Sequence, residues 1–194
     1  MNLQSGDGVS AYLVEIDGCR NFPQPLPVEA KRASHGSELT STDTATAAAK
    51  TILVVDDNED DIMLLRRMFR RSRILNPMQA VNTVEDAICY LKGEGVYSDR
   101  LRYPFPTLLL VDLHLTDGSG FDILRWIREN KGNSPVGVVV LSGSDMNAFK
   151  MAYDLGAHSF LVKPLRFEDL ENMVSHVRGI KLTSSADGYL LDLE

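Results

Sequence analysis

The chain has 194 residues, of which 44% are hydrophobic, and its formal net charge is −7 at pH 7. That length suits one domain with an extension, and the apolar content is sufficient for a real core. The acidic balance disfavours general binding to nucleic acids or anionic membranes, and no apolar run approaches the length of a membrane span.

The first 49 residues are predicted to be an extension without stable structure. They contain scattered Gly, Pro and Ser, the punctuated stretch 21–27 and a Ser/Thr/Ala-rich run over 34–49. Little in this segment can bury enough surface to offset the entropy lost on ordering. The N-terminus also lacks a basic segment followed by an apolar one, so a cytoplasmic protein is expected. Cys19 and Cys89 lie far apart without CxxC spacing and are expected to be reduced thiols.

From residue 51 onwards, apolar runs typical of strands alternate with helical patterns. The strand candidates are 52–55, 78–81, 108–111, 138–141 and 159–162, and helical patterns cover 59–69, 84–92, 121–127, 146–155 and 167–177. Asn58 and Thr83 are expected to cap the first two helices, and Gly156 to follow the fourth. Residues 93–106 are expected to form a loop. This alternation predicts an α/β fold, a doubly wound five-stranded parallel sheet with helices on both faces.

Reactive side chains stand at the carboxyl ends of four of these strands. Asp56 and Asp57 follow the first strand, Asp112 the third, Ser142 the fourth and Lys163 the fifth. The carboxyl ends of strands in an open parallel sheet border one crevice, so these groups are expected to converge. Clustered carboxylates repel one another unless a cation neutralises them, and oxygen ligands suit Mg²⁺ or Mn²⁺. The combination predicts a divalent-metal site that accepts a phosphoryl group.

Four stretches of residues 50–181 resemble the receiver domain of two-component response regulators. They are ILVVDDNEDD at the first strand, LLLVDLHLTDGSGFDIL around the third, VVVLSGS at the fourth and FLVKP at the fifth. The resemblance implies a flavodoxin-like strand order of 2-1-3-4-5. The loop 93–106 and the DDNEDD start are also similar to stand-alone receivers paired with bacterial phytochromes and related sensor kinases.

The resemblance further implies a metal-ligand set. Asp57 and Asp112 would coordinate Mg²⁺ or Mn²⁺ directly, and Asp56 would act largely through water. The backbone carbonyl of His114 would add a ligand. Thr116 replaces the proline that is usual four residues past the acceptor, so this loop is expected to be less rigid.

The resemblance also implies how the phosphoryl group is accepted. Asp112 would be the nucleophile that attacks a phosphohistidine, while Lys163 and the Ser142 hydroxyl would bind phosphoryl oxygens. Ser142 and Phe160 would form a switch, in which the serine moves and the phenylalanine rotates into the vacated space. The changing surface would be the face of the fourth helix and fifth strand.

A phosphohistidine donor implies a sensor histidine kinase or a histidine phosphotransfer protein as partner. The arginines of the first helix, Arg66, Arg67, Arg70, Arg71 and Arg73, form a solvated face that is predicted to dock it. Residues 182–194 are too short for a DNA-binding module and are expected to be a frayed tail. The target is then an unknown downstream protein, with neither DNA nor membrane as partner, and a homodimer is left open.

Two other function classes compete with this hypothesis. The first is a protein-interaction scaffold on the same fold that is never phosphorylated. The presence of all five strand-end residues argues against it, namely Asp56, Asp57, Asp112, Ser142 and Lys163. The second is a metal-dependent phosphohydrolase, which would need an acid-base carboxylate where this chain has His114. The chain is therefore not expected to be an enzyme beyond its own phosphorylation and slow autodephosphorylation.

Overall fold

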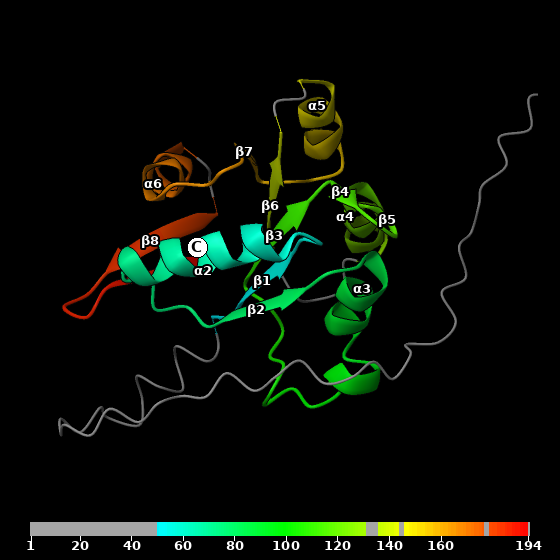
Figure 1. Ribbon diagram of the computed structural model, residues 1–194, viewed down its shortest axis with the longest axis horizontal. Helices are drawn as coiled ribbons and strands as arrows, with labels where there is room; N and C mark the ends of the chain where they lie inside the picture. The colour runs from blue at the N-terminus through cyan, green and yellow to red at the C-terminus, as the bar shows by residue number, and fades with distance from the viewer. Residues whose placement is uncertain (1–49, 131–135, 144–145, 177–178, 194) are drawn as a thin grey trace, which may run out of the picture.

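The computed structural model of the chain describes residues 50–130, 136–143, 146–176 and 179–193, so the predicted extension lies outside it. A five-stranded sheet forms its centre (Figure 1). The strands are β1 (Ile52–Val55), β2 (Met78–Val81), β3 (Leu108–Asp112), β6 (Gly137–Ser142) and β7 (Ser159–Val162). Their order is β2-β1-β3-β6-β7 with every neighbouring pair parallel. The predicted doubly wound sheet is therefore confirmed.

Five helices cover both faces of this sheet. They are α2 (Glu59–Arg71), α3 (Val84–Lys92), α4 (Gly120–Glu129), α5 (Met146–Asp154) and α6 (Phe167–His176). In Figure 1, α2 and α6 lie on one face and α3, α4 and α5 on the other. Each face has its own core, with Leu53 and Val55 of β1 in one and Ile52 and Val54 in the other. None of the described helices is both long enough and apolar enough to cross a bilayer.

The predicted caps fix where the helices begin. The Asn58 side chain accepts hydrogen bonds from the backbone N–H groups of Asp60 and Asp61 at 3.0 and 3.4 Å. Thr83 caps α3 in the same way, and Gly156 has a left-handed φ of 94° after α5. Since Asn58 starts α2 directly after β1, the first turn of this helix lies next to the carboxyl end of that strand.

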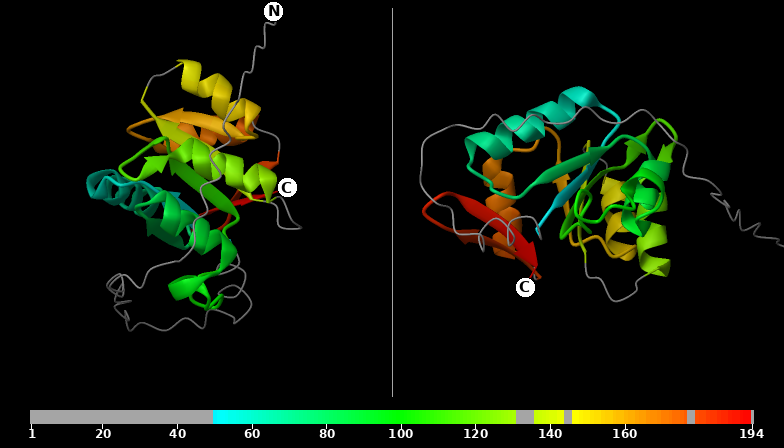
Figure 2. Two further views of the ribbon diagram at one scale, coloured as in Figure 1. Left: turned by 90° about the vertical axis from the view of Figure 1, so that its right-hand side faces the viewer. Right: turned by 90° about the horizontal axis from the view of Figure 1, so that it is seen from below.

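The end of the described chain differs from the expected frayed tail. Strands β8 (Ile180–Ser184) and β9 (Tyr189–Leu193) pair as an antiparallel hairpin, which lies beside α6 (Figure 2). The Asn76 amide holds it, because Nδ2 donates to the Leu191 carbonyl and Oδ1 accepts from the Leu191 N–H, both at 2.8 Å. Leu191 is buried in the core under α2 and α6. The hairpin thus begins before the expected domain end at residue 181.

Residues 93–106 form an ordered connection that contains a 3₁₀ turn, η1 (Gly95–Tyr97). The rings of Tyr90, Tyr97 and Tyr103 pack together with centroids 5.2 to 6.0 Å apart. Arg100 donates to the carbonyls of Tyr90 and Leu91 at the end of α3, both at 2.8 Å. Aromatic packing and a helix cap therefore hold this connection against α3.

Cys89 on α3 is buried and disulfide-bonded, so the expectation of a reduced thiol is wrong for this residue. Separation along the sequence does not prevent a disulfide, because the bond requires only that two Cα atoms approach in space. Cys19 lies outside the described residues. Since disulfides are typical of oxidising compartments, the cysteines no longer support a cytoplasmic location.

The tyrosine cluster predicts a loss of stability in alkali. Burial raises the pKa of the Tyr90 and Tyr97 phenols above their ordinary value of 10.0. The folded state therefore holds these protons more tightly than the unfolded chain, and this stabilising contribution is full below pH 10 and lost above it. We expect the free energy of unfolding in urea to begin to fall at about pH 10 and to continue falling as the pH is raised further. A variant with both residues changed to phenylalanine should show a shallower fall, and an equal fall would contradict this origin.

Candidate phosphoryl-acceptor site

Three aspartates meet at the carboxyl end of the sheet, as the sequence predicts. Asp56 and Asp57 directly follow β1, and Asp112 is the last residue of β3. Each offers a carboxylate oxygen, and these oxygens all lie within 4.8 Å of one another. Asp56 is 0% exposed and Asp112 is 8% exposed, so little water screens their mutual repulsion. A compact group of oxygen donors of this kind fits Mg²⁺ or Mn²⁺.

The Lys163 ammonium lies among these carboxylates. Its Nζ is 2.5 Å from Oδ2 of Asp112, 2.7 Å from Oδ2 of Asp56 and 3.0 Å from Oδ2 of Asp61. Asp61, in the first turn of α2, is the residue that sequence reasoning missed. The available signal was the capped helix start, because a helix that begins at Asn58 turns its first residues towards the end of β1.

The close packing of charges shifts two pKa values. Burial raises the pKa of Asp56, and its hydrogen bonds to Lys163 and to the Asn58 N–H only partly oppose this shift. Burial alone would lower the pKa of Lys163, but its hydrogen bonds to Asp112, Asp56 and Asp61 raise it above the ordinary value. Lys163 is therefore a permanent cation at neutral pH. The ionised form of Asp56 would be stabilised further by a second cation in the crevice.

Asp112 has both of its oxygens oriented by neighbours. Oδ1 accepts a hydrogen bond from the backbone N–H of His114 at 3.1 Å, and Oδ2 accepts one from the Lys163 ammonium. The His114 side chain itself is 79% exposed, and its Nδ1 is 3.9 Å from Asp112 Oδ1. The carboxylate plane is thus fixed by a main-chain donor and an ammonium, which is the pre-organisation that a nucleophile needs.

Ser142 and Lys163 are joined through the main chain. Ser142 ends β6, and its carbonyl accepts the backbone N–H of Lys163 at 3.0 Å. The Ser142 side chain is fully buried, and its Oγ has no hydrogen-bond partner in the described part of the chain. A buried hydroxyl without a partner is uncommon and suits a donor that awaits a ligand. Next to it Gly143 is exposed, with no atom within 4 Å of the position a Cβ would take.

The segment after Asp112 folds into a two-stranded turn, with β4 (His114–Leu115) paired to β5 (Gly118–Ser119). The Asp117 carboxylate accepts the N–H of Val84, the first residue of α3, at 2.9 and 3.0 Å. The loop that contains Thr116 is therefore held to the start of α3 by Asp117, although the usual proline is missing. Sequence reasoning did not identify this role of Asp117.

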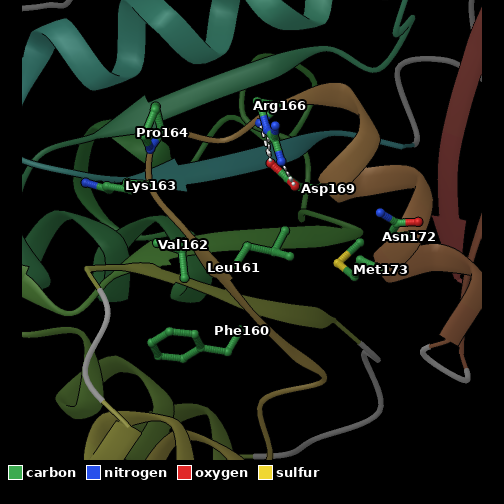
Figure 3. A pocket seen from close by; sticks show the side chains of 9 residues that line it. All are labelled: Phe160, Leu161, Val162, Lys163, Pro164, Arg166, Asp169, Asn172 and Met173. Atoms are coloured by element: carbon green, nitrogen blue, oxygen red, sulfur yellow. Dashed lines mark hydrogen bonds and ion pairs between the residues drawn. The ribbon is translucent and has the colours of Figure 1, made fainter.

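Phe160 lies on β7, away from the carboxylates. Its ring packs edge-on against Phe149 of α5, with centroids 5.8 Å apart. Figure 3 shows Phe160 on the opposite side of β7 from Leu161, which points towards Met173 of α6. These residues line a groove of about 540 Å³ along β7 and α6. The Phe160 ring is therefore partly buried between the core and the groove.

The arginines of α2 form the expected basic face. Arg67, Arg70 and Arg71 are exposed. Arg73 is also exposed but lies beyond the last residue of α2, so its predicted place on the helix is wrong. Arg66 is partly buried, and its Nη1 donates to the Met78 carbonyl at 3.4 Å. This burial lowers the pKa of Arg66 below its ordinary value. Three exposed guanidinium groups therefore remain available to an acidic partner.

Comparisons with known proteins agree with the fold. Residues 52–175 match the response regulator receiver domain family, and the chain belongs to this family. It is 29% identical over 134 residues to the response regulator Rcp1 of Synechocystis sp., an alignment that covers 69% of this chain and 89% of Rcp1.

Solved structures of response regulators are also similar to the chain. Response regulator RPA3017, in red light signalling of R. palustris, is 28% identical with a TM-score of 0.58, covering 65% of this chain and 90% of that one. The Mn²⁺-bound form of Rcp1 has 28% identity and a TM-score of 0.54, covering 64% and 88%. The phosphorylated cyanobacterial phytochrome response regulator RcpA has 29% identity and a TM-score of 0.55, covering 64% and 87%. The chain is therefore similar to stand-alone receivers.

Proposed function

We propose that the chain accepts a phosphoryl group on Asp112 from a phosphohistidine of a sensor histidine kinase or phosphotransfer protein. The observation that carries this proposal is the placement of Lys163 against Asp112 Oδ2 at 2.5 Å, beside three clustered aspartates. The phosphorylated form of RcpA, a relative at 29% identity, supports it.

The chain's own residues account for the transfer step. One oxygen of Asp112 attacks the phosphorus, the P–N bond breaks, and its electron pair stays on the imidazole nitrogen. As the carboxylate oxygen becomes part of an acyl phosphate, its negative charge passes to the phosphoryl oxygens. The Lys163 ammonium then pairs with one phosphoryl oxygen, and the unpartnered Ser142 hydroxyl donates a hydrogen bond to another.

Mg²⁺ or Mn²⁺ would be held by Asp56, Asp57, Asp112 and the backbone carbonyl of His114. The Mn²⁺-bound form of Rcp1 supports this assignment. The metal, when bound, offsets negative charge on the transferring oxygens. The buried Asp56, whose pKa is raised, gains most from such a cation.

Output is proposed to pass through α5 and β7. Movement of Ser142 towards the phosphoryl group would pull on the β6–β7 pairing, in which Ser142 is the register partner of Val162. Phe160, two residues earlier, would then leave its contact with Phe149. The changed surface would bind an unknown downstream protein or a second copy of this chain, and neither DNA nor a membrane is proposed as a partner. The proposed location is the cytoplasm, where the kinase would present its phosphohistidine.

Phosphorylation can be tested directly. The protein is incubated with Mg²⁺ and phosphoramidate, and its intact mass is measured. We expect a single phosphoryl adduct that is lost in Asp112→Asn and prevented by EDTA. Asp99→Asn, in the connection before β3, is the matched control and should keep the adduct. Absence of an adduct on the native protein would instead favour a scaffold that is never phosphorylated.

A further inference from the structure

Asp61 is a carboxylate of the crevice that the proposed reaction does not use. It lies in the first turn of α2, and its Oδ2 is 3.0 Å from Lys163 Nζ. It is not one of the three clustered aspartates. An ammonium group has three protons to donate, and Asp56, Asp61 and Asp112 accept all three. Lys163 therefore has no donor left for an incoming group unless it releases one of these carboxylates.

The surroundings of the Asp61–Lys163 pair favour its persistence. The two side chains are 30% and 20% exposed. They border a hollow of about 20 Å³ whose other lining residues include Leu65 and Leu141, both buried. A space of this size holds about one water molecule, so little solvent reaches the two charges from this side. The pair is thus a built contact of the crevice.

We propose that Asp61 is a positioning residue that competes with the phosphoryl group for Lys163 and thereby slows phosphoryl transfer to Asp112. The inference rests on the proposed function. To bind a phosphoryl oxygen, Lys163 must give up a carboxylate partner, and Asp61 is the one that belongs to neither the acceptor nor the metal cluster. Its charge also repels an anionic phosphoryl donor as it approaches.

The same charge should affect metal binding in the opposite sense. A fourth carboxylate makes the crevice more negative and so attracts Mg²⁺ more strongly. Asp61→Asn keeps the size of the side chain and removes its charge. It is therefore expected to speed phosphoryl uptake at saturating Mg²⁺ while weakening Mg²⁺ binding. Damage to the fold would lower both quantities, so the pair of readouts separates the two explanations.

Asp60→Asn is the matched control. Asp60 stands in the same first turn of α2 and is exposed, and its carboxylate is not a partner of Lys163. The control removes the same formal charge and the same favourable interaction with the helix N-terminus. A difference between the two variants therefore reports on the contact with Lys163.

The experiment measures two properties of the native protein and both variants. Phosphoryl uptake from phosphoramidate is followed by intact mass at saturating Mg²⁺, and Mg²⁺ binding by backbone amide shifts in NMR. We expect Asp61→Asn to be phosphorylated about fivefold faster at subsaturating donor and to bind Mg²⁺ about threefold more weakly, with Asp60→Asn within about twofold of the native protein.

The outcomes distinguish this inference from the proposed function. If the native protein is phosphorylated and Asp61→Asn reacts at the same rate or more slowly, the role of Asp61 is overturned while the proposed function stands. If the native protein takes up no phosphoryl group at all, both are overturned. Faster uptake together with weaker Mg²⁺ binding, confined to Asp61→Asn, supports the competition for Lys163.

Discussion

Lys163→Met is expected to unfold far more readily than the native protein when divalent metal is absent. The substitution removes the only described cation in contact with Asp56, Asp61 and Asp112. Breaking a buried ion pair by removing one partner costs about 3–5 kcal/mol, and the partial exposure of Asp61 places the expected loss near about 3 kcal/mol. Urea unfolding in EDTA measures it.

Adding Mg²⁺ should reverse much of this loss, because a bound cation replaces the missing ammonium. Ligand at about 100 times its dissociation constant stabilises a folded protein by about 2.7 kcal/mol. Lys150→Met is the control, since Lys150 is exposed on α5, and its stability should not depend on metal more than that of the native protein. Equal stability of Lys163→Met and native protein in EDTA would contradict the assigned charge balance.

Gly120→Ala is expected to destabilise the fold and displace the acceptor together. A Cβ at Gly120 would lie 2.2 Å from the carbonyl oxygen of Asp112 and 2.7 Å from Cγ1 of Val111. Both contacts are too short, and the nearer one involves backbone that cannot rotate away. Overpacking typically costs about 1–3 kcal/mol, and the clash with backbone places this substitution at the upper end of that range. The midpoint of urea unfolding and the phosphoryl adduct should both fall.

Gly143→Ala provides the comparison for this substitution. Gly143 also borders the crevice, but a Cβ there would meet no atom within 4 Å. Its free energy of unfolding should remain within about 0.5 kcal/mol of the native value, as for other surface changes. If Gly120→Ala proved as stable as Gly143→Ala, close approach of the α4 start to Asp112 would not be a requirement of the fold.

Much of the fold could be predicted because its strands are buried on both faces. Each of β1, β3 and β6 is a continuous run of apolar residues ending at a reactive one, and such runs are typical of parallel sheets. The starts of α2 and α3 could be predicted from Asn58 and Thr83, because such side chains accept hydrogen bonds from the first N–H groups of a helix. Convergence of the strand ends then placed the aspartates, Ser142 and Lys163 together.

The rest depends on contacts that sequence spacing does not encode. The hairpin of β8 and β9 is held by Asn76, which lies 115 residues before Leu191, and neither strand shows a strong alternation by itself. Asp61 reaches Lys163 only because α2 packs beside β7's carboxyl end, 102 residues away along the chain. Asp117 likewise finds the start of α3 through tertiary structure.

The single main-chain hydrogen bond from Lys163 to Ser142 has an evolutionary consequence. The spacing between the two residues is set by backbone hydrogen bonding between parallel strands. This geometry does not depend on which side chains the strands carry. Core side chains can therefore drift while this spacing is retained, provided their total volume is kept. A relative at 28% identity can share the same sheet on these terms.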